Sequence, residues 1–347
     1  MDPMIYRKKA RRIYCAAVLM LALLLRMFSL PQQSAAIAKK LRTAAVQLPA
    51  ADAVLFLAAG IRLPQDTEPA VRTHTETEPP TGQTEQTPVT EPTEAPPQPV
   101  QLTFDAQEAD AISFRGNCTY TVDKQALLDA PLSWQTPAEG PQVLIIHSHT
   151  SESYTPSEGF EYEASGDYRT LDNAHSVVAV GDMLAETLEA NGISVIHDTT
   201  CHDYPSYNSS YANSRQTIER ELAAHPSIVM VIDVHRDAAE EVFRETAEVE
   251  GQTAAKLMLV VGTDEGGLSH PFWRENLSCA LKLQALANRR YPGLFKSLAL
   301  RASRFNQVET PASLIVEVGS TGNTLPEALT AARYLGNVVA ELLASNR

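Results

Sequence analysis

Three short apolar runs in the second half of the chain each end in imidazole or carboxylate side chains, and this pattern constrains the fold most. The first run leads to His147, His149 and Glu152, the second to His235, and the third contains Glu317. Such runs are typical of buried strands in α/β sheets. Because ligands bind in the crevice at the carboxyl ends of these strands, we expect the five side chains to lie close together.

These residue types match the ligands of a catalytic zinc site, which keeps one position open for water. His147 and His149 are two residues apart, so both point the same way on an extended segment. A turn at His149 would return Glu152 to the same side. We interpret His147, His149, Glu152 and His235 as candidate zinc ligands; the alternative for any one histidine is a simple hydrogen bond in a loop. The sequence thus predicts a zinc hydrolase.

Glu317 lies inside an otherwise apolar run, where an unpaired carboxylate would cost much free energy. A general base beside zinc and its water would use such a carboxylate. The alternative is a structural ion pair with an arginine such as Arg304. Next to His235, either Asp233 or Asp237 is placed to orient the imidazole ring.

The rest of the second half alternates between strand and helix patterns, which predicts an α/β fold with a mixed, mostly parallel sheet flanked by helices. We expect the catalytic domain over residues 139–347 and a small β lead-in over 102–138. The expected strands are 143–147, 193–196, 228–234, 257–261 and 313–318, and the expected helices are 177–192, 211–224, 273–290 and 325–344.

The front of the 347-residue chain predicts a membrane anchor and a tether. Residues 1–38 combine a basic end with an apolar segment, which favours a cytoplasmic N-terminus and a single span. The alternative is a cleaved signal peptide, since small residues follow the apolar segment. Residues 39–101 are expected to be a juxtamembrane segment and a linker rich in Pro, Thr and Glu that buries no core. Both alternatives place the remaining chain outside the cytoplasm.

The formal net charge of −14 argues against a general nucleic-acid partner. A nucleic-acid binding surface requires a basic patch, and no basic, aromatic-interleaved stretch occurs in the sequence.

Several ordered motifs carry a resemblance to a known family. They are His-x-His-x-x-Glu-Ser-Tyr at 147–154, His-Asp-Tyr-Pro-Ser-Tyr-Asn at 202–208, Ile-Asp-Val-His-Arg-Asp at 232–237, Tyr-Pro-Gly-Leu at 291–294, Phe-Asn-Gln at 305–307 and Glu-Val-Gly at 317–319. Together, over roughly residues 140–340, they resemble the stage II sporulation protein P family. That family is similar to zinc-dependent N-acetylmuramoyl-L-alanine amidases.

The resemblance implies a peptidoglycan hydrolase that acts during engulfment in endospore-forming bacteria. Its substrates would be peptidoglycan stem peptides and glycan strands. It would cut the amide between muramic acid and L-alanine, and also peptide cross-links. A single-pass anchor in the cell membrane would place the catalytic domain between the forespore and mother-cell membranes, where sporulation proteins D and M would be its partners.

The resemblance also implies roles for single residues. His149 corresponds to the first amidase histidine, His235 to the second, and Glu317 to the catalytic glutamate. His147 is an alternative to His149 or a support for it. Related amidases carry the carboxylate ligand where this chain has Asp172 or His175, whereas the motif after the first strand favours Glu152. The chain has Phe305 where the family pattern leads us to expect tyrosine.

Three residues before the last strand are candidates for substrate binding, namely Arg304, Asn306 and Gln307. Two rival functions stay open at this point. One is a zinc peptidase that cleaves only peptide cross-links, and the other is a non-catalytic module that binds the cell wall.

Overall fold

A computed structural model describes residues 102–240 and 243–347. The expected anchor over 1–38 and the expected linker over 39–101 lie outside these described residues. Within the described part of the chain, no helix is both long enough and apolar enough to span a membrane.

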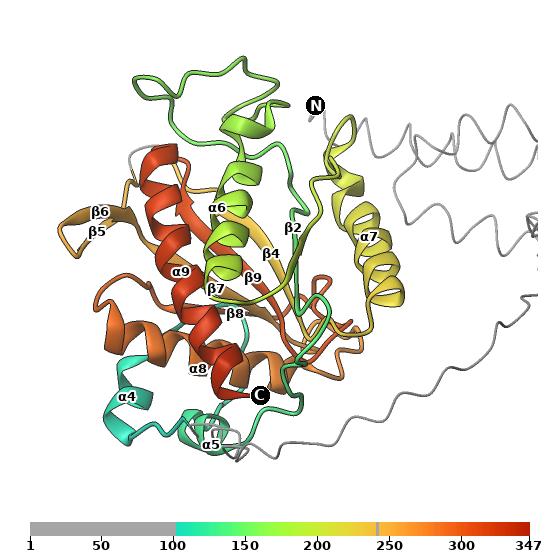
Figure 1. The fold of residues 1–347 in the computed structure, drawn as a ribbon, viewed down its shortest axis with the longest axis vertical. Coiled ribbons are helices and arrows are strands. Elements are labelled where there is room, and N and C mark those ends of the chain that lie inside the picture. Colours follow the sequence, from blue (N-terminus) through green and yellow to red (C-terminus); the bar gives the residue numbers. More distant parts are fainter. Residues whose placement is uncertain (1–101, 241–242) are drawn as a thin grey trace, which may run out of the picture. The chain divides into compact units, whose positions relative to one another are not determined.

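A seven-stranded sheet forms the centre of the described chain (Figure 1). Five of its six strand pairings are parallel and the pairing of β7 with β9 is antiparallel, which confirms the predicted mixed, mostly parallel sheet. The strand order is β1-β8-β7-β9-β4-β2-β3. The strands are β1 (Phe114–Gly116), β2 (Val143–Ile146), β3 (Val195–His197), β4 (Met230–Asp237), β7 (Leu257–Gly262), β8 (Leu298–Arg301) and β9 (Ser313–Ser320).

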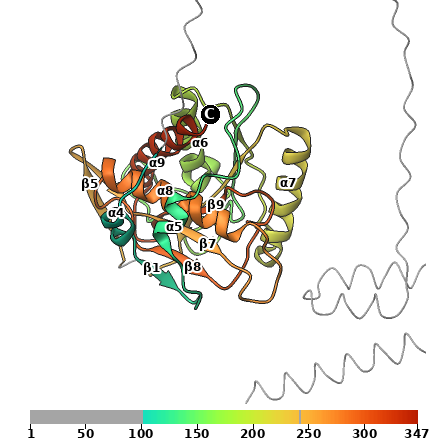
Figure 2. The ribbon, with the colours of Figure 1, turned by 90° about the horizontal axis from the view of Figure 1, so that it is seen from below.

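Helices cover both faces of this sheet (Figures 1 and 2). One face packs against α6 (Val177–Ala190), α8 (Trp273–Arg290) and α9 (Leu325–Ser345), and the other packs against α7 (Ser210–Ala224). The alternation along β2 explains this division. Val143 and Ile145 enter the larger core, whereas Leu144 and Ile146 pack against α7, so both faces of the strand are apolar.

Local sequence signals account for where the long helices begin and end. The Ser176 hydroxyl accepts a hydrogen bond from the Val178 N–H at the start of α6, and Asn191-Gly192 ends that helix. Glu327 accepts the N–H of Thr324 at the start of α9. These signals explain why the predicted and observed helices agree within a few residues.

The lead-in differs from the expected small β unit. It contains two short helices, α4 (Ala106–Ala111) and α5 (Lys124–Asp129), and the single strand β1, which joins the edge of the main sheet. The strand ends early because Gly116 has a φ of +123°, and a Cβ at this position would lie 2.1 Å from the Leu300 carbonyl oxygen. Phe104 and Leu128 pack into the same core as residues 139–347, so the lead-in belongs to the same folded unit.

Two further elements were not predicted. One is β8, a short strand that follows the turn after α8. The other is a hairpin of β5 (Thr246–Val249) and β6 (Gln252–Ala255) outside the main sheet. Its two-residue turn has positive φ angles at both Glu250 (51°) and Gly251 (76°), as a tight hairpin of this length requires.

Candidate active site

The adjacent strands β4 and β9 bring His235 and Glu317 side by side. The two residues are paired in the register of these strands. Along β4, Val231 packs on the α7 face of the sheet, and Asp233 and His235 follow it at alternate positions. An imidazole and a carboxylate that were separate in sequence therefore lie together at one end of the sheet.

The loop after β2 adds His149 and Glu152 to this pair. The chain turns at His149, whose carbonyl accepts the Glu152 N–H at 3.2 Å. The ring of His149 lies edge-on to that of His235, with 5.3 Å between their centroids. Glu152 Oε2 lies 3.5 Å from His235 Nδ1. We call His149, Glu152, His235 and Glu317 the histidine–glutamate cluster.

Buried carboxylates hold the loop in this position. The Ser148 N–H and hydroxyl donate to the two oxygens of Asp233 at 2.7 and 2.6 Å. The Ser151 hydroxyl donates to Asp203 at 2.7 Å, and Arg169 donates to the same carboxylate at 2.7 Å. The turn is thus attached both to β4 and to the segment that precedes α7.

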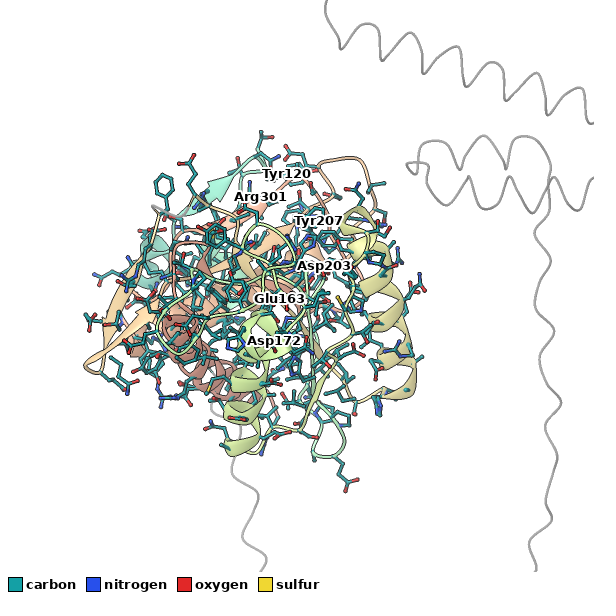
Figure 3. The ribbon with its side chains drawn as sticks, turned by 90° about the horizontal axis from the view of Figure 1, so that it is seen from above. Tyr120, Glu163, Asp172, Asp203, Tyr207 and Arg301 are labelled. Carbon is teal, nitrogen blue, oxygen red and sulfur yellow. The ribbon has the colours of Figure 1, made fainter. Side chains whose placement is uncertain are left out.

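Tyrosines form a wall beside His149. The Tyr207 ring, in the short helix η3 (Tyr207–Ser209), stacks on the His149 ring with 4.4 Å between centroids, and Tyr211 of α7 lies edge-on at 5.4 Å. Tyr207 is 52% exposed, so this side of the cluster faces solvent. Figure 3 shows Tyr207 and Asp203 beside α7 on this face.

Burial and the charge of His235 set the protonation of the cluster. Burial raises the pKa of Glu317 to about 7. Burial also opposes ionisation of Glu152, but the hydrogen bond and charge of His235 outweigh it and hold that pKa at about 2. Burial lowers the pKa of His149 to about 4 and keeps its ring neutral. For His235, burial is outweighed by the nearby Asp233 and Glu152 carboxylates, which raise its pKa well above the usual value.

Asp233 contacts the His235 ring, as expected for a carboxylate that orients this imidazole. Its Oδ1 lies 2.9 Å from His235 Nε2, although the contact is out of line for a hydrogen bond. Asp237 instead pairs with Lys296 at 3.2 Å. Of the two candidates, only Asp233 contacts the His235 ring in the described structure.

Unpaired polar atoms make the cluster suitable for zinc. His149 Nδ1, His235 Nε2 and Glu317 Oε2 are buried without a hydrogen-bond partner among the described residues. Two imidazoles with a buried carboxylate are donor types that zinc prefers. Over 102–240 and 243–347, no three His, Cys, Asp or Glu side chains already converge as metal ligands. For His235 to bind zinc, one of its ring nitrogens would have to give up its contact with Glu152 or Asp233 and coordinate the metal instead.

The structure does not bring His147 into the cluster. The His147 ring is fully buried, with Nδ1 3.0 Å from the Val234 carbonyl oxygen and Nε2 2.8 Å from His197 Nε2. Both ring nitrogens are therefore occupied by contacts outside the cluster, with Val234 of β4 and His197 of β3. Burial lowers the pKa of His147 to about 3, consistent with a neutral structural residue.

Asp172 and His175 also lie apart from the cluster. They pair with each other at 2.7 Å, and Asp172 accepts the N–H of Ala174 at the start of the short helix η2 (Asn173–His175). In Figure 3, Asp172 lies over α6, away from Tyr207. Between the alternatives for the carboxylate ligand, Glu152 is the one that contacts His235.

The three expected substrate residues have other contacts. Arg304 donates to the Ser269 carbonyl at 3.1 Å. The amide of Asn306 donates to the Tyr211 carbonyl at 2.8 Å, which ties its loop to α7. The buried Gln307 side-chain amide forms its hydrogen bonds with backbone groups. Its oxygen accepts the N–H of Gly262 at 2.6 Å, and its nitrogen donates to the Val260 carbonyl at 2.8 Å. Asn306 and Gln307 thus attach their loop to α7 and β7.

Sequence reasoning missed several residues around the cluster. Asp203 and Arg169 anchor the His149 turn, and Arg236 donates its backbone N–H to Glu152 at 3.2 Å. One signal for Arg236 was available, because an arginine at the end of a buried apolar strand needs a partner or a function. A signal for Tyr207 was also available, because Tyr204, Tyr207 and Tyr211 follow one another closely in the sequence.

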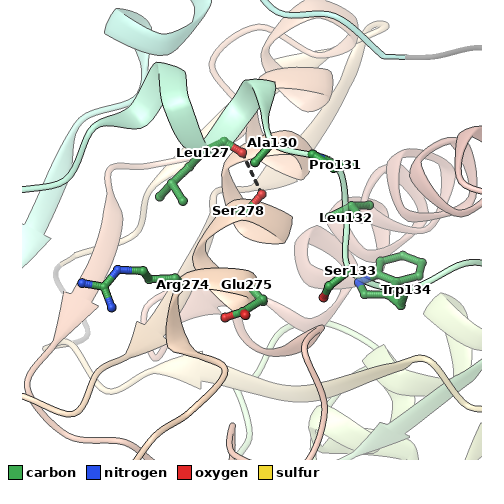
Figure 4. A pocket seen from close by; sticks show the side chains of 9 residues that line it. All are labelled: Leu127, Ala130, Pro131, Leu132, Ser133, Trp134, Arg274, Glu275 and Ser278. Atoms are coloured by element: carbon green, nitrogen blue, oxygen red, sulfur yellow. Dashed lines mark hydrogen bonds between the residues drawn. The ribbon is translucent and has the colours of Figure 1, made fainter.

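The structure also has a hollow outside the cluster (Figure 4). It has a volume of about 270 Å³ and lies between the segment after α5 and the start of α8, with Leu127, Leu132 and Trp134 on its walls. None of its lining residues belongs to the histidine–glutamate cluster, so it adds nothing to the site.

Solved structures of amidases are similar to part of this chain. The N-acetylmuramoyl-L-alanine amidase AmiC2 of Nostoc punctiforme is 13% identical and covers 59% of this chain and 97% of its own, with a TM-score of 0.35. The CwlD amidase from Clostridioides difficile, solved in complex with the GerS lipoprotein, is also 13% identical and covers 59% of this chain and 95% of its own, again with a TM-score of 0.35.

Sequence comparison covers more of the chain. The stage II sporulation protein P of Bacillus subtilis (strain 168) is 30% identical over 264 residues, which are 72% of this chain and 62% of that protein. The chain thus spans less than two thirds of this relative's length. The family model for stage II sporulation protein P matches residues 62–340. The chain therefore belongs to the stage II sporulation protein P family.

Proposed function

We propose that this protein is a peptidoglycan hydrolase of sporulation that uses zinc to cleave the amide between N-acetylmuramic acid and L-alanine. Membership of the family and the histidine–glutamate cluster both support this function. The observation that carries the proposal is the register pairing of His235 with Glu317, next to the His149 turn. This arrangement joins potential metal ligands to a carboxyl that is able to accept a proton.

Each residue of the cluster has a proposed role. His149, Glu152 and His235 would hold the zinc ion. When bound, zinc acts as a Lewis acid that polarises a carbonyl oxygen and makes water more acidic. Glu317 would accept the proton of the attacking water and transfer it to the leaving amine nitrogen. A carboxyl group beside the proposed ligands, with one oxygen free of hydrogen bonds within the described chain, is placed for both halves of this transfer.

The neighbours of the cluster would position the substrate and the ligands. The exposed ring of Tyr207 offers a flat apolar surface next to His149, suited to a sugar or peptide group. Asp233 would keep the His235 ring in place, since it contacts that ring and also binds the Ser148 turn.

The cellular setting of the proposal rests on sequence outside the described residues and on the family. An anchor in residues 1–38 would hold the catalytic domain between the forespore and mother-cell membranes. Sporulation proteins D and M would be its partners during engulfment. A linker over 39–101 would give the domain reach across the peptidoglycan layer.

Product analysis tests the proposed bond. Zinc-loaded full-length protein is incubated with purified peptidoglycan, and the released fragments are identified by mass spectrometry. An amidase yields free stem peptides that begin with L-alanine and glycan strands that keep the lactyl carboxyl group. A peptidase of cross-links yields stems that stay attached to sugar, and a non-catalytic binding module releases nothing; either result would refute the proposed bond.

A further inference from the structure

A second hollow lies at the same end of the sheet as the cluster. It has a volume of about 340 Å³, and its walls come from the loops that follow β2, β4 and β9. Asp167, Tyr168, Arg236, Glu240 and Thr321 line it. Nothing in the proposed chemistry uses this hollow, although Arg236 directly follows His235 in β4.

Arg236 is the unusual residue of this hollow. Its side chain is only 5% exposed, and its guanidinium donates to two carbonyl oxygens, those of Ser153 at 3.1 Å and Tyr168 at 3.4 Å. Among the described residues, no carboxylate forms an ion pair with it. The charge of Arg236 acts on the nearby Glu152 and Glu317 carboxylates, but neither forms an ion pair with the guanidinium, which is therefore able to pair with an anion that enters the hollow.

The local backbone is consistent with a functional role. The pairing of β4 with β9 is irregular between His235 and Asp237, at the position of Arg236. Irregularities of this kind re-aim side chains and are frequent next to active sites. Tyr168, which also lines the hollow, has a φ of +48°, a conformation that non-glycine residues rarely adopt and that is often found at functional sites.

The rim of the hollow has the opposite charge. Asp167 and Glu240 are exposed acidic residues, and neither side chain forms an ion pair within the described chain. A simple anion would be attracted by Arg236 and repelled by these two carboxylates. A group that carries both an ammonium and a carboxylate would satisfy both sets of charges.

We propose that this hollow binds a zwitterionic α-amino-carboxylate group on the side chain of a stem peptide. Its carboxylate would contact Arg236, and its ammonium would contact Asp167 and Glu240. Diaminopimelate carries this group as the dibasic residue of a stem peptide, whereas lysine has the amine alone. The inference rests on the proposed function, because that function makes the stem peptide the substrate.

The position of the hollow suits this ligand. Glu152 connects the two sites, since its Oε2 lies 3.5 Å from His235 Nδ1 and accepts the Arg236 N–H at 3.2 Å. An extended peptide advances about 3.3–3.6 Å per residue, so two residues span about 7 Å between the first amide and the third residue, and the side chain of that residue reaches further. A stem peptide cut at the cluster could therefore place its dibasic residue in the hollow.

Calorimetric titration of the zinc-loaded full-length protein carrying Glu317→Gln tests this inference, because this variant is expected to bind stem peptides without cutting them. The ligands are three sugar-linked stem peptides that differ only at the third residue: diaminopimelate, diaminopimelate acetylated on its side-chain amine, and lysine. The free group is expected to bind about tenfold or more tightly than either of the others, as for the loss of one charge-assisted contact. Equal affinity for all three, or binding of none, would overturn the inference.

Variants assign the selectivity to the hollow. Arg236→Gln is expected to abolish the preference over lysine, and the double variant Asp167→Asn, Glu240→Gln is expected to abolish the preference over the acetylated peptide. The double variant keeps the Arg236 contacts to the loop, so it separates recognition from folding. Arg115→Gln, at an exposed position on β1, is the matched control and should keep both preferences. Unchanged selectivity in both hollow variants would contradict the assignment.

The rate at which protein with Glu317 intact releases peptide from the same three ligands distinguishes the two proposals. Selective binding without release would support the hollow and refute the hydrolase. Release with equal efficiency from the lysine and diaminopimelate peptides would support the hydrolase and refute the hollow.

Discussion

At the residue scale, the cluster depends on a few buried groups that only tertiary structure brings together. His235 and Glu317 are neighbours because β4 and β9 pair in one register. Both residues could be identified from the sequence as candidates for the site, because polar side chains in buried strands usually have a partner or a function. The sequence alone could not decide between His147 and His149, since that choice depends on where the chain leaves the strand.

Replacement of either cluster histidine should remove the metal. We expect His149→Ala or His235→Ala to lose about one equivalent of zinc per chain, because a zinc site needs its full ligand set. The measurement is metal content by mass spectrometry after dialysis, with a melting curve to verify folding. His225→Ala is the matched control, since His225 lies at the exposed end of α7. Full metal content in both cluster variants would refute the ligand assignment.

At the element scale, the long helices were predictable from local signals and the short elements were not. Serine before α6 and the Thr324–Glu327 pair before α9 are strong signals of a helix start. The strands β1 and β8 have only three and four residues, so their identity depends on the sheet edge that they join. The lead-in helices α4 and α5 have six residues each, which is too short for a clear periodic pattern.

The close packing of α6 against the sheet predicts that Gly181→Ala destabilises the protein. Within a helix, Gly→Ala normally stabilises by about 1 kcal/mol. At Gly181, however, a Cβ would lie 2.5 Å from His197 Nε2 and 2.7 Å from His147 Nε2. We expect Gly181→Ala to lower the free energy of unfolding by about 1–3 kcal/mol, as overpacking does. Urea denaturation measures the change, and a gain in stability would show that these histidines do not pack against α6 in this way.

The start of α9 gives a prediction about pH. Burial raises the pKa of Glu327, but the hydrogen bonds from Arg244, Asn323 and Thr324 outweigh it and lower the pKa overall. Because the folded-state pKa is lowered, the stabilisation is present above the unfolded value of 4.5 and is lost as pH falls through the folded value. Glu327→Gln should therefore cost about 1 kcal/mol of unfolding free energy at pH 7.

Chemical denaturation at several pH values measures that cost. The difference between wild type and Glu327→Gln should shrink as the pH is lowered below 4.5. A difference that stays constant down to pH 3 would mean that the charge of Glu327 does not stabilise the helix start. Glu341→Gln is the control and should change little, because Glu341 lies on the same helix as Glu327 and only forms an exposed ion pair with Arg290 of α8.

At the scale of the whole molecule, the sheet places the cluster and the second hollow at one end, formed by the loops after β2, β4 and β9. The alternation of strands and helices was enough to predict the fold class. It could not show that β7 runs antiparallel to β9, so that β7, β8 and β1 point their carboxyl ends away from the cluster. Reversal of one strand depends on long-range pairing, which has no local signal.

The composition of the linker leads to a prediction for the complete chain. Residues 64–100 are rich in Pro, Thr and Glu and offer little apolar surface to bury. Scrambling this segment at constant composition should leave the rate of peptide release per molecule unchanged, within about twofold. Dye-labelled peptidoglycan provides the assay, with immunoblots to match protein levels. Loss of release at normal protein levels would reveal a specific binding motif in the segment.

Glu317→Gln tests the central claim most directly, because it keeps the shape of the side chain and removes the proton acceptor. The measurement is the rate of peptide release from peptidoglycan per zinc-loaded, folded molecule. We predict that zinc content and melting temperature stay close to wild type while turnover falls by about 100-fold or more, as for loss of a general base. Turnover close to that of wild type would contradict the mechanism.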